Sequence, residues 1–210
     1  MLLSQVEAWK LLSKYNISLP KQFIIDKNLS KINNIKYPVA LKVDSPDIIH
    51  KSDTGLVFLN LRNKTEVKEK LRLGKKILKK SKVKDSRFIV QQMVSGLELI
   101  VGVKQDDIFG PVVVFGIGGV FVEALKDISM RVTPLKKKDC LFMINEIRGS
   151  KLLEGYRNIK VNKDKIIDLL MKTSQLAITE KDISELDFNP VIATDKKAIV
   201  VDARIIKNVK

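Results

Sequence analysis

Short apolar runs and two stretches with a helical period divide the first half of the chain. Residues 4–15 have the period of a helix, and Ser4 with Glu7 forms a capping box at its start. A second helix is predicted to begin after Asn63, because asparagine caps helices well. Its apolar stripe is formed by Val67, Leu71, Gly74 and Leu78. Apolar, β-branched runs predict three strands, at residues 38–43, 56–61 and 87–93.

The second half of the chain continues this mixture of strands and helices. Two apolar runs joined by a polar turn at Gly110 predict a hairpin, and the apolar pattern resumes at 120–125 after the glycine-rich segment 116–119. The hairpin strands are predicted at residues 97–103 and 111–115. Helices are predicted at residues 137–147 and 162–178, the second capped by Asn162. Closing strands are predicted at residues 183–188, 191–193 and 198–201.

This interspersed order predicts a two-lobed α+β fold, because a doubly wound α/β sheet would show a strict alternation of strand and helix. The segment Val94-Ser95-Gly96 has the composition of a hinge. We therefore expect one subdomain at residues 1–95, which includes the N-terminal helix, and a second subdomain at residues 96–210.

Composition narrows the classes of function. Of the 210 residues, 45% are hydrophobic and 30% are charged, as in ordinary globular proteins. No apolar stretch approaches the roughly 20 residues that span a bilayer, so no membrane association is expected. The single cysteine, Cys140, excludes an internal disulfide and fits a reducing, cytoplasmic location. The formal net charge of +15 suits an anionic substrate or an acidic partner subunit. Nucleic-acid binding is not expected, because the lysines are spread along the chain with few aromatic residues among them.

The only histidine, His50, lies in a polar segment eight residues after Lys42, which is predicted on a strand. A lysine on a strand can hold a nucleotide phosphate, although one flanked by apolar residues can also simply extend from a sheet edge into solvent. A histidine on the following loop can be a nucleophile, an acid–base group or an ordinary surface residue. We do not expect His50 to bind a metal, because the chain has only one cysteine and no second histidine. In the sharper interpretation, His50 carries a phosphoryl group covalently.

Two further features are candidates for phosphate contact. Gly118 and Gly119 lie between predicted strands, where exposed backbone amides can bind phosphate oxygens; a tight turn is the alternative. Arg131 follows the acidic residues Glu123 and Asp127. We expect it either to pair with those acids or to contact a transferring phosphoryl group.

A two-residue turn at residues 195–196 would set the register of the C-terminal hairpin. Cross-strand partners then have residue numbers that add to 391, so Asn189 faces Asp202 and Asp187 faces Arg204. Opposite Cβ atoms in such pairs lie about 4.5–5.5 Å apart. Oxygen atoms of Asn189 and Asp202 could therefore share one Mg²⁺ ion, which prefers one or two protein ligands together with substrate phosphates. A salt bridge and a polar pair at the end of a sheet are the alternative.

Eight segments, in their order along residues 5–206, resemble the ATP-grasp β subunit of ADP-forming acyl-CoA synthetases, in the sense of acetate–CoA ligase (ADP-forming). They are PVALK at 38–42, SPDIIHKSD at 45–53, ELIVGV at 98–103, FGP at 109–111, FGxGG at 115–119, ExLKD at 123–127, RxxP at 131–134 and ELDxNP at 185–190. The combination is specific, although each segment alone is not.

The resemblance implies an ATP-grasp fold with ATP or ADP bound between two β-rich lobes. Lys42 and Arg131 would contact the phosphates, and Glu98 would face the nucleotide near its sugar. Asn189 and Asp202 match the Mg²⁺ ligands of the family. The adenine would meet the backbone of the linker formed by Gln92, Met93 and Val94, where the family usually has glutamate in place of Gln92.

The resemblance also implies a reaction and a partner. His50 matches a phosphorylated histidine on a mobile loop, which would take a phosphoryl group from a CoA-binding α subunit and deliver it to ADP. The chain lacks the CoA-binding domain of fused relatives, so we expect a separate subunit, in an α2β2 assembly. The β subunit of succinate–CoA ligase is the alternative enzyme, disfavoured because it does not typically use a histidine here. A non-catalytic nucleotide-sensing module is the alternative of a different class.

Overall fold

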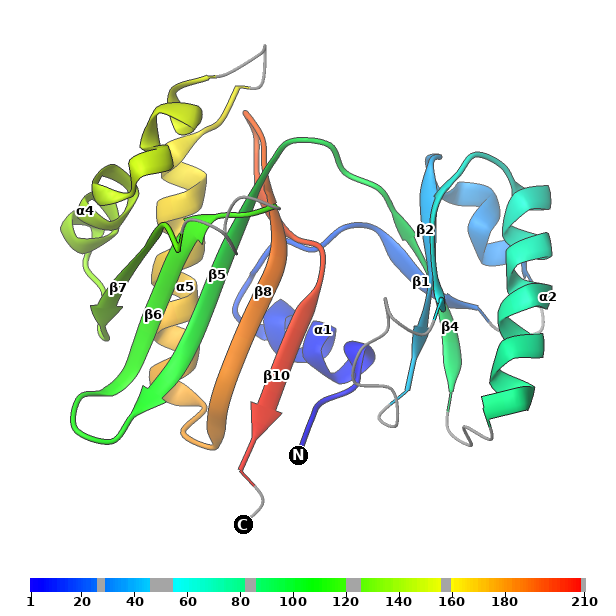
Figure 1. The fold of residues 1–210 in the computed structure, drawn as a ribbon, viewed down its shortest axis with the longest axis horizontal. Helices are drawn as coiled ribbons and strands as arrows, with labels where there is room; N and C mark the ends of the chain where they lie inside the picture. Colours follow the sequence, from blue (N-terminus) through cyan, green and yellow to red (C-terminus); the bar gives the residue numbers. More distant parts are fainter. Residues whose placement is uncertain (26–28, 46–54, 82–85, 120–125, 156–159, 209–210) are drawn as a thin grey trace. The chain divides into compact units, whose positions relative to one another are not determined.

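The computed structural model describes the chain except residues 26–28, 46–54, 82–85, 120–125, 156–159 and 209–210 (Figure 1). Its internal contacts divide the chain into two units, each with its own hydrophobic core. The larger unit contains residues 1–3, 7–19 and 95–210, and the smaller unit contains residues 4–6 and 20–94. Within the described ranges, no helix is both long enough and apolar enough to cross a membrane.

The smaller unit is a four-stranded antiparallel sheet in the order β1-β4-β2-β3, with a helix packed on one face. Its elements are β1 (Gln22–Ile25), the 3-10 helix η1 (Leu29–Asn34), β2 (Val39–Asp44), β3 (Val57–Leu61), α2 (Lys64–Ser81) and β4 (Arg87–Gln92). Alternate residues of β2, namely Val39, Leu41 and Val43, are buried in one core with Val67 and Leu71 of α2. This packing fixes which side of β2 faces the helix, and places Lys42 on the other side.

Helix α2 starts where the sequence predicts. The Asn63 side chain accepts a hydrogen bond from the backbone N–H of Glu66 at 2.9 Å and donates one to the Glu66 carboxylate at 2.8 Å. The predicted stripe is buried, and Gly74 brings the helix close to β4. A Cβ atom at Gly74 would lie 2.7 Å from the ring of Phe88, so a larger side chain would push the helix off the sheet.

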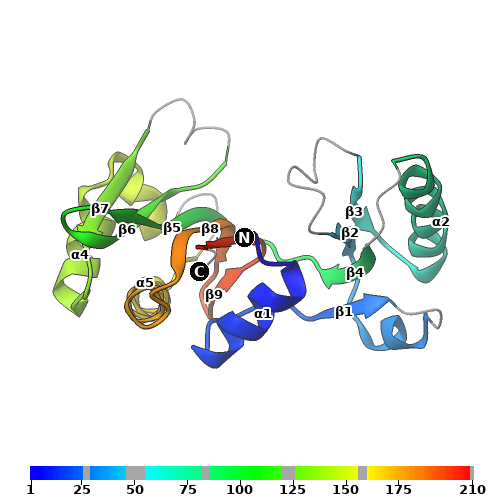
Figure 2. The ribbon, with the colours of Figure 1, turned by 90° about the horizontal axis from the view of Figure 1, so that it is seen from below.

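The larger unit has one antiparallel sheet in the order β10-β8-β5-β6-β7, with β9 paired to β8. Its elements are α1 (Gln5–Lys14), β5 (Leu97–Asp106), β6 (Gly110–Ile117), β7 (Ile128–Val132), α4 (Lys137–Glu146), the 3-10 helix η2 (Arg148–Glu154), α5 (Lys163–Thr179), β8 (Ile183–Ala193), β9 (Ala198–Val200) and β10 (Ala203–Lys207). Helices α1 and α5 lie on the same side of this sheet (Figure 2). Their apolar faces, with that of α4, share one core with alternate residues of the strands.

The strands of the larger unit therefore have a core face and an opposite face, here called the outer face. Leu99, Leu186 and Phe188 are buried on the core face. Residues that alternate with them, among them Glu98, Gly102, Glu185, Asp187 and Asn189, belong to the outer face. Most of the charged side chains of β8 are thus presented on one side.

The N-terminal helix packs in the larger unit. Ala8, Leu11 and Leu12 are buried in the core that contains β5 and α5. This differs from the predicted subdomain of residues 1–95, because sequence distance placed the helix with the strands that follow it. The segment before the helix also joins the larger sheet: Leu2 bridges to Ile206 of β10, and the N–H of Leu3 donates to the carbonyl of Ile205 at 2.9 Å.

Most predicted elements are confirmed within two or three residues, with the following exceptions. Strands β1, β7 and β10 were not predicted. The two strands predicted at 183–188 and 191–193 form the single strand β8. The strand predicted at 120–125 lies outside the described residues.

Candidate functional site

The C-terminal hairpin has the predicted register. Val191 pairs with Val200 and Asp187 with Arg204, so partner numbers add to 391. The turn is closed by a hydrogen bond from the N–H of Thr194 to the carbonyl of Lys197 at 2.8 Å. In the same register, the N–H of Asn189 donates to the carbonyl of Asp202 at 3.2 Å. The two residues of the predicted metal site are therefore cross-strand neighbours.

The chemistry of this pair suits a hard cation. Asn189 is exposed and Asp202 is half-buried, and as cross-strand neighbours they place an amide oxygen and a carboxylate on adjacent strands. Among the described residues, no group of three or more His, Cys, Asp or Glu side chains could hold a metal. Two oxygen ligands, without an all-protein cage, are the donor set that Mg²⁺ uses when substrate phosphates and water complete its shell. The residues present therefore fit Mg²⁺ held together with a nucleotide.

A third carboxylate adds negative charge beside the pair. Burial raises the pKa of Asp187 above its ordinary value, and the nearby Glu185 and Asp202 raise it further, while Arg204 lowers it. Burial is the main cause of the raised pKa, and repulsion between the carboxylates of this face adds to it. A cation bound on this face would lower that repulsion.

The glycine loop brings two of the predicted nucleotide-binding positions together. A Cβ atom at Gly118 would lie 2.9 Å from the carbonyl carbon of Glu98 and 3.0 Å from the nitrogen of Leu99. Only a residue without a Cβ atom allows the backbone at position 118 to approach β5 this closely, so this residue must be glycine. Gly119 has a φ of +85°, and a Cβ there would lie 3.5 Å from the Glu98 carboxylate. The N–H of Gly118 donates to the Glu98 carbonyl at 2.7 Å, so this amide is used inside the fold and is not presented to a phosphate.

Arg131 is held by an acid that the sequence analysis did not consider. Its guanidinium makes two hydrogen bonds to the carboxylate of Glu146 in α4, with Nη1–Oε1 at 2.8 Å and Nη2–Oε2 at 2.6 Å. The hydroxyl of Ser129 donates to the same carboxylate. These contacts raise the pKa of Arg131 and lower the pKa of Glu146. The geometry favours an ion pair for Arg131, but with a different partner from the predicted ones.

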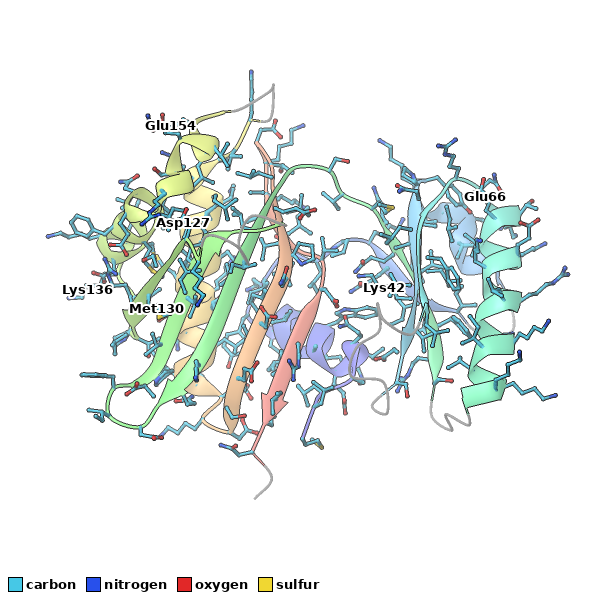
Figure 3. The ribbon with its side chains drawn as sticks, viewed as in Figure 1. Lys42, Glu66, Asp127, Met130, Lys136 and Glu154 are labelled. Carbon is cyan, nitrogen blue, oxygen red and sulfur yellow. The ribbon has the colours of Figure 1, made fainter. Side chains whose placement is uncertain are left out.

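Arg131 and the pair formed by Asn189 and Asp202 lie on opposite faces of the larger sheet. Arg131 is opposite Val113 of β6, which is buried on the core face, whereas Met130 alternates with it and is 51% exposed (Figure 3). Asn189 is on the outer face. The structure therefore does not bring Arg131 together with Asn189 and Asp202, and its phosphate contact stays a prediction.

Asp127, the predicted partner of Arg131, has a structural contact instead. Its two carboxylate oxygens accept hydrogen bonds from the backbone N–H groups of Arg148 and Gly149, each at 2.7 Å (Figure 3). These are the first amides of η2, which have no partner within the helix itself. Asp127 thereby ties the start of β7 to η2. The other predicted partner, Glu123, lies outside the described residues.

In the smaller unit, Lys42 lies in the interior of the sheet. Strand β2 is central, and Lys42 is paired with Ile89 of β4 on one side and Val57 of β3 on the other (Figure 3). The alternative of a lysine extending from a sheet edge is therefore wrong for this position. Lys42 is half-buried on the side of the sheet away from α2. The contact of Lys42 with a nucleotide phosphate stays a prediction.

The predicted adenine linker follows β4. The N–H of Gln92 donates to the carbonyl of Lys21 at 2.8 Å, and the N–H of Met93 donates to the carbonyl of Pro38 at 3.1 Å. Both amides are used within the smaller unit, and the backbone contact of this linker with adenine stays a prediction. His50, the predicted phosphoryl carrier, lies outside the described residues.

The thiol of Cys140 can be excluded from the chemistry. The residue is fully buried in α4, and burial raises its pKa to about 11. Because the thiolate is the reactive form, this cysteine is inert near neutral pH.

Comparison with known proteins decides which family this arrangement represents. A model of the ATP-grasp domain matches residues 1–206. The chain belongs to the ATP-grasp family. The mixed α+β fold of two antiparallel sheets agrees with this membership, as the sequence predicted.

Several ATP-grasp relatives match nearly the whole chain. Identity is 40% over 209 residues with acetate–CoA ligase (ADP-forming) II of Archaeoglobus fulgidus, covering 98% of this chain and 30% of that protein. Identity is also 40% over 212 residues with the beta subunit of acetate–CoA ligase (ADP-forming) I of Pyrococcus furiosus, covering 97% of this chain and 91% of that subunit. The chain thus spans under a third of one relative and nearly all of the other.

Solved ATP-grasp structures show the same agreement. Acetyl-coenzyme A synthetase 1 of Ca. Korarchaeum cryptofilum, in complex with coenzyme A and Ca-AMPCP, matches with a TM-score of 0.92 and 37% identity, covering 99% of this chain and 93% of that one. In another structure of that protein, with coenzyme A and Mg-AMPPCP, the phosphohistidine segment points towards the nucleotide binding site. Its TM-score is 0.87 at 38% identity, again covering 99% of this chain and 93% of that one.

In this ATP-grasp chain the predicted site residues are divided between the two units. Lys42 and the segment 92–94 belong to the smaller unit. The larger unit contributes Glu98 with the glycine loop and the pair Asn189 and Asp202. The sequence analysis missed Glu146, because nothing in the local pattern of α4 shows that one of its acids reaches across to β7.

Proposed function

We propose that this chain is the nucleotide-binding β subunit of an ADP-forming acyl-CoA ligase of the acetate–CoA ligase type. The observation that carries this proposal is the similarity to a protein named as the beta subunit of such a ligase. The two sequences are 40% identical over 212 residues, and the match covers 91% of that subunit. The reaction would be acyl-CoA + ADP + phosphate ⇌ carboxylic acid + CoA + ATP. A second relative, 4-hydroxybutyrate–CoA ligase (ADP-forming) of Nitrosopumilus maritimus, is 38% identical, so we leave the acid unspecified.

Each residue of the site would have one task. Lys42 would hold nucleotide phosphates, and Glu98 beside the glycine loop would contact the nucleotide near its sugar. Asn189 and Asp202 would hold Mg²⁺, which when bound would neutralise phosphate charge. An imidazole nitrogen of His50 would form a P–N bond as the P–N bond of a phosphohistidine on the α subunit breaks. The His50 P–N bond would then break as an oxygen of ADP forms the new P–O bond.

A covalent carrier explains how two separate sites can share one phosphoryl group. The acid and CoA would react on a CoA-binding α subunit, with which this chain would assemble as α2β2. Because His50 would move the phosphoryl group between subunits, the nucleotide and the acyl group need not occupy the same site. We expect the chain alone to have almost no ligase turnover.

Phosphoryl transfer to this chain is the decisive test. The purified chain is mixed with a candidate α subunit, Mg²⁺ and ATP labelled in the γ-phosphate, and acid-labile, base-stable label is measured on each subunit. We expect label on this chain that is removed by ADP and absent in the His50→Asn variant. Lys76→Gln, an exposed position on α2, is the control and should label normally.

Measuring the ADP affinity of the His50→Asn variant shows whether the variant has lost only phosphoryl transfer or has lost its fold. The His50→Asn variant should bind Mg-ADP within about threefold of the unchanged chain. Absence of label despite normal ADP binding would overturn the carrier role and favour a nucleotide-sensing module. Normal labelling in His50→Asn would place the acceptor on another residue.

A further inference from the structure

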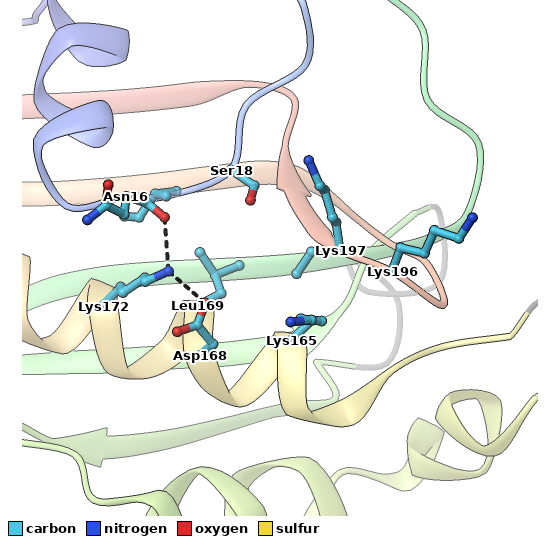
Figure 4. A pocket seen from close by; sticks show the side chains of 10 residues that line it. Asn16, Ser18, Lys165, Asp168, Leu169, Lys172, Lys196 and Lys197 are labelled. Atoms are coloured by element: carbon cyan, nitrogen blue, oxygen red, sulfur yellow. Dashed lines mark hydrogen bonds and ion pairs between the residues drawn. The ribbon is translucent and has the colours of Figure 1, made fainter.

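A hollow lined by lysines lies in the larger unit, apart from the residues assigned above. It has a volume of about 240 Å³ and is bordered by the segment after α1, the first half of α5 and the turn between β8 and β9 (Figure 4). Four of its lining residues are lysines, two from α5 and two from the turn: Lys165, Lys172, Lys196 and Lys197. We call it the lysine hollow. The lining residues that the structure describes include none of the predicted nucleotide-binding or metal-binding residues.

One of the four lysines is engaged within the fold. The Lys172 ammonium donates to the backbone carbonyl of Asn16 at 2.9 Å and to the carboxylate of Asp168 at 2.7 Å (Figure 4). This contact joins α5 to the segment after α1 and neutralises Asp168, the one acid among the described residues that line the hollow. Lys172 therefore has a structural task, and Asp168 does not balance the other lysines.

The remaining three lysines leave an excess of positive charge. Lys165, Lys196 and Lys197 are exposed, and the ion pairs formed within the described ranges do not include them. Figure 4 shows the Lys196 side chain directed away from Lys165 and Lys197, but all three lysines border the same small hollow and give it a positive potential that would attract a multiply charged anion. Each lysine can offer three N–H donors to such an anion.

The size of the hollow limits the anion. Pockets for drug-sized organic ligands have volumes of about 300–1,000 Å³, so 240 Å³ is suited to something smaller. The polar lining, with Leu169, Ile17 and Ala198 as its apolar members, offers little surface for a base or an acyl chain. We propose that the lysine hollow binds a small, multiply charged oxyanion of the pyrophosphate class. This proposal does not rest on the proposed function.

Calorimetric titration with pyrophosphate tests the site directly. The full chain is titrated without Mg²⁺, at ionic strength held constant with KCl, and orthophosphate is titrated in parallel. We expect binding of pyrophosphate that weakens at least tenfold in the double variant Lys165→Gln/Lys197→Gln. The double variant Lys165→Arg/Lys197→Arg, which keeps both charges, should bind within about threefold of the unchanged chain. Lys172 is kept in all variants because it supports the fold.

Two controls separate the hollow from general charge and from the nucleotide site. Lys75→Gln/Lys76→Gln removes the same charge from the exposed side of α2 and should leave pyrophosphate binding unchanged. Saturating ADP should not displace pyrophosphate. The proposal is overturned if pyrophosphate does not bind at millimolar concentration, if both Gln double variants lose binding equally, or if ADP competes. Equal binding of orthophosphate and pyrophosphate would overturn the assignment to a multiply charged anion larger than phosphate.

Discussion

Removing the Arg131–Glu146 ion pair should cost stability without costing nucleotide affinity. The pair is bidentate, with N–O distances of 2.8 and 2.6 Å, and Ser129 adds a third hydrogen bond to the carboxylate. The two side chains are 36% and 42% exposed, so solvent screens their attraction. Exposed pairs contribute about 0.2–1 kcal/mol, and the bidentate geometry places this one near the upper end, at about 1 kcal/mol.

The assay is a double-mutant cycle. Free energies of unfolding are measured by urea denaturation for the unchanged chain, Arg131→Gln, Glu146→Gln and the double variant. We expect a coupling energy of about 1 kcal/mol and a decrease in melting temperature of roughly 2–4 °C for each single variant. ADP affinity is measured in the same four proteins and should vary by less than about twofold. A coupling energy below about 0.2 kcal/mol would refute the stabilising role, and a tenfold loss of ADP affinity in Arg131→Gln alone would restore the phosphate contact.

The pair also gives an acid-dependent part of the stability. Arg131 first, and Ser129 second, lower the pKa of Glu146 below its ordinary value of 4.5. A carboxylate with a lowered pKa in the folded state stabilises the fold fully above its unfolded pKa, and this contribution is lost as the pH falls through the folded pKa. The difference in stability between the unchanged chain and Glu146→Gln should therefore be constant near neutral pH and shrink below about pH 4.

Three further predictions test other parts of the argument. Asn63→Ala should lower the free energy of unfolding by about 1 kcal/mol, whereas Asn63→Ser, whose hydroxyl can still cap the helix, should lower it by less, as measured by urea denaturation. Gly118→Ala should destabilise by about 1–3 kcal/mol and weaken ADP binding, because its Cβ would lie 2.9 Å from the Glu98 backbone; Gly102→Ala, with 3.3 Å to its nearest atom, should be milder. Asp202→Ala should raise the Mg²⁺ concentration needed for ADP binding at least tenfold, whereas Asp195→Ala in the hairpin turn should not; identical Mg²⁺ dependence would exclude the proposed metal pair.

The sequence correctly predicted features that depend only on interactions between residues close together in the chain. The start of α2 follows from one side chain, Asn63, which contacts an amide three residues away. The pairing of Asn189 with Asp202 follows from the length of one turn, because a hairpin register is set once the turn is known. These predictions needed no information about distant parts of the chain.

Strand β7 shows where such rules fail. An alternating strand is expected to bury its apolar residues, yet Ile128, Met130 and Val132 are exposed while Ser129 is buried beside Arg131. The pattern is inverted because Glu146 of α4 supplies a partner for the polar side chains on the core side. Neither the strand nor the partner of Arg131 can be read from the segment alone.

The two-unit arrangement likewise depends on contacts that sequence distance hides. Helix α1 is followed directly by the strands of the smaller unit, but its buried face lies against α5 and β5. Strand β1 has four residues, all half-buried, so neither alternation nor a continuous apolar run marks it. The lysine hollow is assembled from three segments far apart in the chain, and no spacing in the sequence indicates it.

The pairing of residues 1–3 with β10 has a consequence for synthesis on the ribosome. The smaller unit is complete once Val94 has emerged, and it has a core of its own to fold around. The larger unit must wait for its last strand, although α1 is made first. At about 5–20 residues per second, the roughly 110 residues that follow take on the order of ten seconds. During that time the apolar face of α1 has no sheet to cover it, so the nascent chain exposes a binding site for chaperones that the finished protein conceals.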